Sequence, residues 1–274
     1  MPEAIPASLR VEHRFVDEVG DTTFYGAGKQ IILGMEGVSR TFGMGIVKIG
    51  RPLEEVRAEI VALQKQIEND RLVNTIPSVA KRVARGGFFF HACKDTPDVR
   101  AVFLRYLADL PCEAEIVMAR KIPALFMNKH HGNDEEFYAD VLSHLIKGRL
   151  KRERRLVLNI AERGSSTRQN ALAEALFKAH GRAGKRWDTQ ELKAQVVFNI
   201  QTPLTEPLLN VADYFGWAVQ RVFEKGETRF YDYLRDKIRV VTDLYDFANY
   251  GTNRNYYDKR NPLTSNNKIG PLST

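Results

Sequence analysis

Residues 11–21 of the chain read VEHRFVDEVGD, which predicts a first strand that ends in a carboxylate-rich turn. Its residues alternate as in a β-strand, where successive side chains point to opposite faces. Phe15 and Asp17 therefore share one face, and Val16 and Glu18 share the other. A carboxylate that continues an apolar face at the mouth of a central strand is costly unless it is paired or bound to a metal. Asp17 is thus the first candidate metal ligand.

The turn that ends this strand is rich in carboxylates. Glu18 and Asp21 flank Val19-Gly20 and follow Asp17 directly. Like charges so close together repel one another unless a cation compensates them. The other explanation is an ordinary β-hairpin turn, in which Asp and Gly are common. We expect Glu18 and Asp21 to support a divalent metal at Asp17.

The rest of the chain places this strand in a larger sheet. Strands are predicted over residues 11–18, 42–49, 113–120, 156–161 and 194–200, and a further one begins at residue 22. Helices are predicted over residues 53–72, 135–150, 167–180, 206–224 and about 228–249, and a further one begins at residue 97. A strand meander followed by alternating helices and strands predicts the α/β class, with a mixed sheet flanked by helices. No repeat or linker divides the chain. We expect one domain over residues 11–250 with insertions, and an irregular tail over 251–274.

Length and composition describe an ordinary globular protein. The chain has 274 residues, of which 43% are hydrophobic, so it can bury a large core without disulfides. No apolar run approaches the roughly 18 residues of a membrane helix, and the N-terminus lacks a signal-peptide pattern. Cys93 and Cys112 fit a reducing compartment as plain thiols. We therefore expect a cytoplasmic protein with no membrane segment.

The charge balance favours an anionic partner. The 41 Lys and Arg residues exceed the 34 Asp and Glu residues by seven. Basic residues that neutralise phosphates release counterions and so drive nucleic-acid binding. Five basic residues gather in 149–155 and three more in 182–186. Solubility alone is the other explanation of this charge.

Two further acids stand at positions suited to chemistry. Asp213 lies on an apolar helical stripe, with Leu209 four residues before it and Trp217 four after it. An ionised group there needs a partner, which could also be a backbone amide or a buried Arg. Glu162 closes the apolar run LVLNIA, at the carboxyl end of a strand, where α/β proteins place their active sites. A solvated Glu is the alternative there.

The loop after Glu162 is suited to phosphate contacts. Arg163 and Arg168 lie in it, near the start of a predicted helix. Asp17, Glu162 and Asp213, from two strands and a late helix, could converge on a pair of metal ions, which would stabilise both oxygens of a phosphoryl transfer. Magnesium or manganese suits an all-carboxylate site.

These motifs carry a family resemblance over about residues 11–263. FVDEVGD (15–21) resembles the DESGD signature of the bacterial and phage family known as domain-of-unknown-function family number 3800. LLNVADYFGWAVQR (208–221) resembles that family's late QLADLLAGAI helix, and FFFHACKDTPDVR (88–100) resembles its middle motif. DLYD (243–246) and NPL (261–263) resemble the ending of one subgroup.

The resemblance implies a ribonuclease H-like fold, whose enzymes cut or transfer nucleic acid with two metals held by carboxylates. Asp17 matches the first-strand acid and Asp213 the late-helix acid. Glu18 matches the signature Glu, and His91, with Lys94 nearby, matches the polar residue of the middle motif. The chain departs from the family at two places. Val19 replaces the signature Ser, and Ala161, with Glu162 beside it, stands where many members have Asp.

We therefore predict a metal-dependent nuclease-like phosphodiesterase that acts on DNA or RNA, in a setting such as phage defence or a mobile element. Asp17, Glu162 and Asp213 would hold Mg²⁺ or Mn²⁺, with Glu18 and Asp21 in support. Substrate would be bound by four basic side chains, namely Arg163, Arg168, His91 and Lys94. The alternative is a catalytically degenerate module that binds nucleic acid or a protein partner.

Overall fold

The structure, a computed structural model, describes residues 10–150, 154–162, 169–183, 196–250 and 254–270. Its strands are β1 (Arg10–Gly20), β2 (Thr41–Ile49), β3 (Cys112–Arg120), β4 (Arg154–Ala161), β5 (Val196–Gln201), β6 (Ile238–Leu244) and β7 (Tyr256–Tyr257). Its α-helices are α1 (Leu53–Asn69), α2 (Pro77–Val83), α3 (Pro97–Asp109), α4 (Pro123–His130), α5 (Asp134–Ile146), α6 (Gln169–Arg182), α8 (Leu209–Lys225), α9 (Arg229–Leu234) and α10 (Phe247–Tyr250).

The strands form one mixed sheet in the order β5-β4-β1-β2-β3-β6-β7. β1, β2 and β3 make an antiparallel meander, while β4 pairs parallel to β1, β5 parallel to β4, and β6 parallel to β3. This confirms the predicted α/β class and mixed sheet, and the order agrees with a ribonuclease H-like arrangement. Because β1, β3, β4, β5 and β6 run the same way, their carboxyl ends meet at one edge of the sheet.

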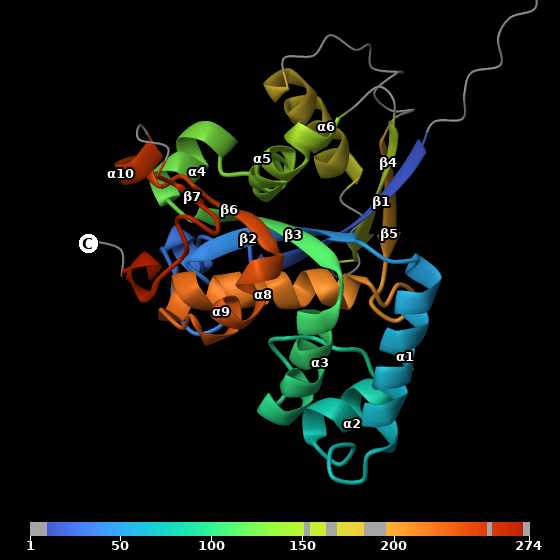
Figure 1. Ribbon diagram of the computed structural model, residues 1–274. Coiled ribbons are helices and arrows are strands. Elements are labelled where there is room, and N and C mark those ends of the chain that lie inside the picture. The colour runs from blue at the N-terminus through green and yellow to red at the C-terminus, as the bar shows by residue number, and fades with distance from the viewer. Residues whose placement is uncertain (1–9, 151–153, 163–168, 184–195, 251–253, 271–274) are drawn as a thin grey trace, which may run out of the picture.

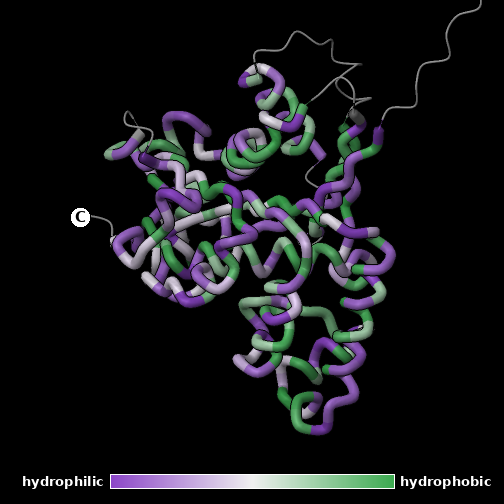
Figure 2. Tube along the Cα trace, viewed as in Figure 1, coloured by the Kyte–Doolittle hydropathy of each residue, from purple (hydrophilic) through white to green (hydrophobic). Residues whose placement is uncertain are grey.

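Helices cover both faces of this sheet (Figure 1). Phe15 of β1 belongs to a core with α1–α3, α8 and α9, whereas Val16 belongs to a second core with α4–α6. Green hydrophobic stretches recur between purple hydrophilic ones along the helices on both sides (Figure 2), as expected of helices that bury one stripe. β1 is thus a central strand that buries Phe15 on one face of the sheet and Val16 on the other.

Two predicted elements are wrong. Residues 22–25 form no strand and make only an isolated bridge, between Tyr25 and Ile31. Gly20, with a φ of 81°, ends β1, and the chain that follows leaves the sheet, where both edges of β1 are paired with β2 and β4. The predicted helix over 228–249 ends early as α9, and Ile238–Leu244 forms β6 against β3. The β-branched sequence IRVVTDL suits that parallel pairing.

The tail differs in part from the expected irregular segment. Tyr256–Tyr257 pairs with β6 as β7, and Ser265–Asn267 forms a short 3-10 helix.

The acids of the DLYD motif have a structural role. Asp243 and Asp246 are buried and both form ion pairs with Arg120, at 2.6 and 3.0 Å. In the described part of the chain, no helix is long and apolar enough to cross a membrane.

Candidate active-site cleft

A cleft of about 730 Å³ lies where β1 and β4 end and α8 crosses them. Its lining includes most of the residues predicted for the site. The titratable side chains among them are Asp17, Glu18, Asp21, Glu36, Arg40, His91, Cys93, Glu162, Asp213, Arg221, Glu224 and Lys225. Residues from five separate parts of the sequence therefore meet at the carboxyl edge of the sheet, as expected for α/β proteins.

Two glycines allow α8 to lie close to Asp17. Gly45 of β2 pairs with Asp17 across the ladder and presents no side chain to the helix. On the helix, Gly216 faces Val19 of β1, at a spacing where only a small residue fits without shifting its neighbour. The turn of α8 that contains Asp213 is therefore held against the end of β1.

Asp213 is fixed by the segment before α3. Its Oδ2 atom accepts a 2.6 Å hydrogen bond from the backbone N–H of Ala92 and lies 3.5 Å from Nδ1 of His91. One of the alternatives foreseen for this residue, a bond to a backbone amide, is thus present. Both contacts use Oδ2, and among the described residues Oδ1 has no partner. The side chain is 12% exposed and lines the cleft.

His91 is held in place by a buried carboxylate. Asp95 accepts hydrogen bonds from the backbone N–H of His91 and from the hydroxyl of Tyr214. It also forms a buried ion pair with Arg82 at 2.7 Å. Arg100 donates to the carbonyl oxygens of Ala92 and Asp95. This network orders the 91–95 turn, so the imidazole, 29% exposed, stands at the cleft beside Asp213.

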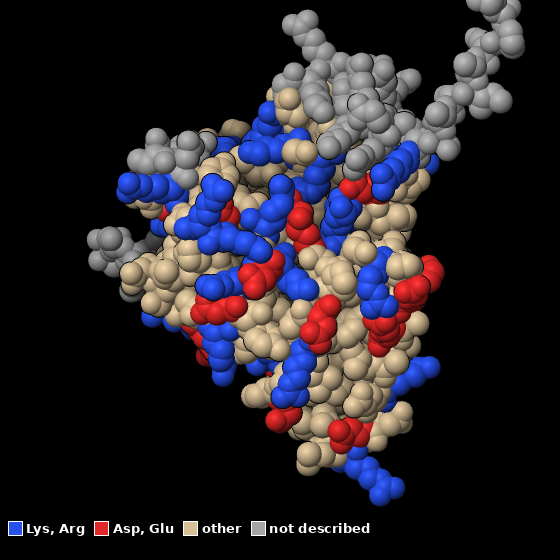
Figure 3. All heavy atoms as spheres, viewed as in Figure 1, with Lys and Arg blue, Asp and Glu red and all other residues tan. Residues whose placement is uncertain are grey.

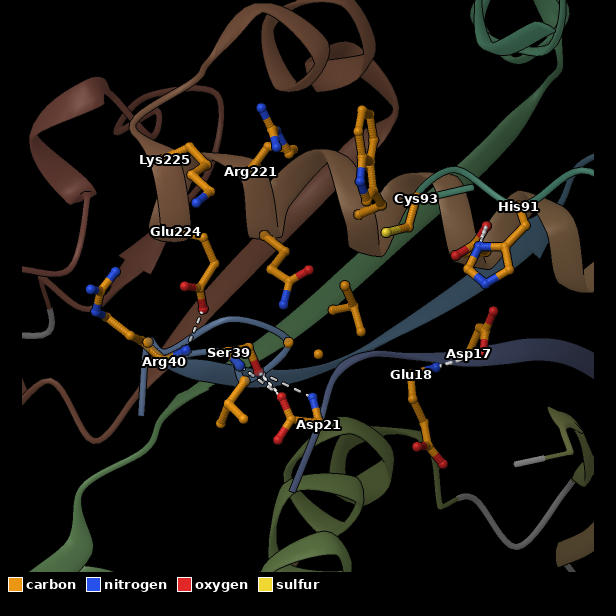
Figure 4. Close-up of a pocket in the computed structure, with 18 of the residues that line it drawn as sticks. Asp17, Glu18, Asp21, Ser39, Arg40, His91, Cys93, Arg221, Glu224 and Lys225 are labelled. Atoms are coloured by element: carbon orange, nitrogen blue, oxygen red, sulfur yellow. Dashed lines mark hydrogen bonds and ion pairs between the residues drawn. The ribbon is translucent and has the colours of Figure 1, made fainter. Parts of the chain in front are cut away.

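Asp17 and His91 face one another across the cleft, whereas the Glu18 carboxylate points away from Asp17 (Figure 4). The Oδ1 atom of Asp17 accepts a hydrogen bond of 2.7 Å from the backbone N–H of Glu18. Strand alternation explains the divergence of the two side chains. Asp17 therefore joins Asp213 and His91, and Glu18 lies at the rim toward the other face of the sheet.

The middle-strand position is occupied by Ala161. Ala161 packs with the core that contains Phe15, so it stands on the face of Asp17. Glu162 follows it and is exposed, and its backbone N–H continues the ladder by donating to Gln201 at 2.8 Å. Alternation along that ladder places the Glu162 side chain on the opposite face. Glu162 therefore lines the cleft from the face of Glu18 and not from the face of Asp17.

Asp21 has a structural role that the sequence did not reveal. It accepts hydrogen bonds from the backbone N–H and hydroxyl of Ser39 and forms a 3.0 Å ion pair with Lys121, whose side chain is fully buried. Burial would raise the pKa of Asp21, but the Ser39 hydrogen bonds and the Lys121 charge bring that pKa below its ordinary value. Both oxygens of Asp21 are engaged, so this carboxylate anchors the 21–39 loop.

Basic side chains that were not predicted line the other half of the cleft (Figure 4). Arg40 follows the 34–39 loop, and Arg221 and Lys225 lie on α8, about two and three turns after Asp213. Glu224 between them accepts hydrogen bonds from the backbone N–H groups of Arg40 and Thr41, so it secures the start of β2. No local sequence motif predicts that these residues line the cleft, because they come together only in the folded chain.

The predicted phosphate-binding residues are only partly placed. His91 lines the cleft, but Lys94 is exposed and does not. Arg163 and Arg168 lie outside the described residues, as do Lys151 and Arg152 of the basic segment 149–155. Cys93 and Cys112 are free thiols, and Cys93 is exposed in the cleft.

The carboxylates suit one hard cation better than a metal pair. Within the described ranges, no three His, Cys, Asp or Glu side chains are grouped so as to hold a metal ion. Magnesium commonly takes only one or two carboxylates and completes its shell with water and substrate phosphate. Asp17 and Asp213, both oxygen ligands lining one cleft, fit that smaller donor set. The three-acid set with Glu162 does not fit.

Comparison with known proteins adds no relative. A scan against protein-family models, a search of curated proteins and a search of solved structures each find no match. The family resemblance seen in the motifs therefore stays a prediction.

Proposed function

We propose that this chain is a nucleic-acid phosphodiesterase of ribonuclease H-like fold whose centre is formed by Asp17, Asp213 and His91. The observation that carries the proposal is the placement of Asp17, from the first strand, and Asp213, from a late helix, in one cleft at the carboxyl edge of the sheet. The resemblance to domain-of-unknown-function family number 3800 assigns the same two acids. The net charge of +7 supports an anionic substrate.

Asp17 and Asp213 would hold one Mg²⁺ or Mn²⁺ ion together with a phosphate of the substrate. Such an ion supplies Lewis acidity and makes a bound water more acidic. The hydrogen bond from Ala92 keeps one oxygen of Asp213 in place, and the other oxygen would bind the ion. Fixed ligands need no reorganisation when charge develops in the transition state.

His91 is placed to bind a phosphate oxygen or to transfer a proton. Its ring stands beside Asp213, and its backbone is fixed by Asp95. An imidazole can act as a general acid or base only when it is held within hydrogen-bond distance of the reacting oxygen. Arg40 and Lys225 would hold the flanking phosphates in the other half of the cleft, because charge-assisted hydrogen bonds to phosphate are the strong ones, whereas the guanidinium of Arg221 already pairs with Glu227.

The test is cleavage of single- and double-stranded DNA and RNA with Mn²⁺ or Mg²⁺. Asp17→Asn and Asp213→Asn should each reduce cleavage by at least about 100-fold, because each keeps the shape and removes a charge, and a chelator should stop the wild type. Glu54→Gln is the matched control, since this acid on α1 is 88% exposed. Equal cleavage by wild type and both Asn variants would refute the proposal.

One observation favours a second candidate, a nucleic-acid-binding module without catalysis. Ala161 stands on the face of Asp17 where a third acid would be expected, and Glu162 is exposed. A module of this kind would bind nucleic acid with a steep salt dependence and cleave nothing. Salt-sensitive binding by the wild type, with no cleavage in either metal, would establish this candidate in place of the enzyme.

A further inference from the structure

A second hollow lies beside the cleft, between α3 and α9. It has a volume of about 300 Å³, at the small end for pockets that take small molecules. Three arginines line it, Arg100, Arg105 and Arg229, together with Phe230 and Tyr233. None of the described residues that line this α3–α9 groove is Asp or Glu. The groove therefore combines positive charge with aromatic surface.

Among the described residues no acid lines the groove itself, and of its three arginines Arg229 pairs with Glu227 at 3.0 Å, so Arg100 and Arg105 supply its uncompensated charge. On the face drawn in Figure 3, Lys and Arg side chains gather around the sheet, but Asp and Glu side chains lie among them. The polar hollow at the amino ends of the strands is an example, since its Arg149 and Arg239 both pair with Glu115. Charges neutralised in this way have little left for a ligand.

The side chains of the α3–α9 groove are ordered and partly free for contact. Arg100 lies 4.5 Å above the ring of Trp217 and is anchored by two backbone carbonyls. Arg229 lies 4.4 Å above the ring of Phe230 and donates to Glu227 at 3.0 Å. Tyr233 is 52% exposed, and Arg105 is exposed on α3. An exposed ring next to fixed guanidinium groups is the arrangement on which unpaired bases stack.

Trp217 connects this groove to the cleft. Its ring lines the cleft and lies 4.6 Å, centroid to centroid, from the ring of Phe230, which lines the groove. Arg221, on the cleft side, lies 5.8 Å from the same indole. An unbroken path of arginine and aromatic side chains thus leads from the cleft to Tyr233.

We propose that the α3–α9 groove binds an unpaired nucleotide of the same strand whose phosphate lies in the cleft. This inference rests on the proposed nucleic-acid substrate and names its form, a single-stranded segment. The groove is too small for a duplex, whereas one base stacked on Tyr233 with its phosphate near Arg105 matches both its size and its charge. The substrate class is therefore single-stranded nucleic acid, or a duplex with a single-stranded extension.

The test measures binding and not cleavage. Fluorescence anisotropy in the presence of a chelator would follow single-stranded oligonucleotides from about 4 to about 16 nucleotides. We expect affinity to rise along the series for the wild type. Tyr233→Ala and Arg105→Gln should each weaken binding of the longer oligonucleotides by at least about fivefold and leave the shortest unchanged. Tyr233→Phe should bind as the wild type, because it keeps the ring.

Tyr256→Ala is the matched control, a tyrosine 43% exposed on β7. Unchanged oligonucleotide binding in both groove variants would overturn the proposal. So would an acidic peptide that displaces the oligonucleotide from the wild type but not from Tyr233→Ala, because that result would assign the groove to a protein partner. The two proposals fail separately. If the protein cleaves nucleic acid but its affinity does not rise with oligonucleotide length, the groove proposal is wrong. If affinity rises with length but nothing is cleaved, the proposed catalytic centre is wrong.

Discussion

Gly45 pairs with Asp17 across the β1–β2 ladder, and a Cβ atom added to Gly45 would lie 3.4 Å from the carbonyl oxygen of Ala212 in α8. One methyl group thus fits in ordinary contact, and anything larger meets the helix backbone. The absence of a side chain at Gly45 therefore lets α8, which carries Asp213, lie against the ladder beside Asp17.

Substitutions at Gly45 test this spacing. Gly45→Val should destabilise the fold by about 1–3 kcal/mol through overpacking and should reduce cleavage, since α8 is pushed away from β1. Gly45→Ala is the matched control, and its stability should change by less than about 1 kcal/mol. Urea unfolding and the cleavage assay measure both effects. If both variants kept full activity, the spacing of the two acids would not limit the chemistry.

Ala161 offers a gain-of-function test of the missing acid. Ala161→Asp would add a third carboxylate on the face of Asp17, so Mn²⁺ should bind about tenfold more tightly because the ligand charge increases. Without metal, the added like charge should lower the thermal stability. Titration calorimetry and thermal unfolding with and without Mn²⁺ measure these effects. Glu162→Gln should change neither, and a loss of Mn²⁺ affinity in that variant would return Glu162 to the metal site.

Much of the fold could be predicted from the sequence because its signals are local. Alternation in 11–18 and the apolar run 156–161 each identified a strand of the sheet. The error at 228–249 arose because Phe230, Leu234, Ile238 and Val241 are spaced as on one helix face, although Ile238 begins a strand. Whether Ile238–Leu244 continues the helix or forms a strand depends on the unpaired edge of β3, which exists only once the sheet has formed.

The site was predictable only where a residue is unusual in its own context. Asp17 and Asp213 interrupt apolar stripes, so the sequence marks them. Arg221 and Lys225 look like ordinary solvated helix residues until α8 is laid along the cleft. Asp21 was assigned to the metal because Lys121, its partner, lies 100 residues away and leaves no local sign.

The ion pair of Asp21 with Lys121 yields a stability prediction. Asp21→Asn should cost about 2–4 kcal/mol at pH 7, because it leaves the buried ammonium without its carboxylate. Lys121→Met in that background should restore a large part of the loss, since no stranded charge remains. Chemical unfolding of the two single variants and the double variant gives the coupling. Additive losses would show that the cost comes from the Ser39 hydrogen bonds.

The same pair predicts a pH dependence with a definite sign. The pKa of Asp21 is lower in the folded chain than its ordinary value of 3.8. The unfolded chain therefore binds more protons just below that value, so this contribution is fully present above about pH 4 and is lost as the pH falls through the folded pKa. The difference in unfolding free energy between wild type and Asp21→Asn should shrink below pH 3.8. A difference that grew there would contradict the ion pair.

The most direct measurement is the anomalous scattering of Mn²⁺ in a crystal grown with a non-cleavable single-stranded oligonucleotide. The account predicts one peak in contact with the carboxylates of Asp17 and Asp213 and with a phosphate oxygen, and no peak at Asp21 or Glu162. Asp213→Asn crystals prepared in the same way should lose that peak. A peak held by Glu162, or a bound oligonucleotide whose phosphates avoid Asp17 and Asp213, would contradict the proposed centre.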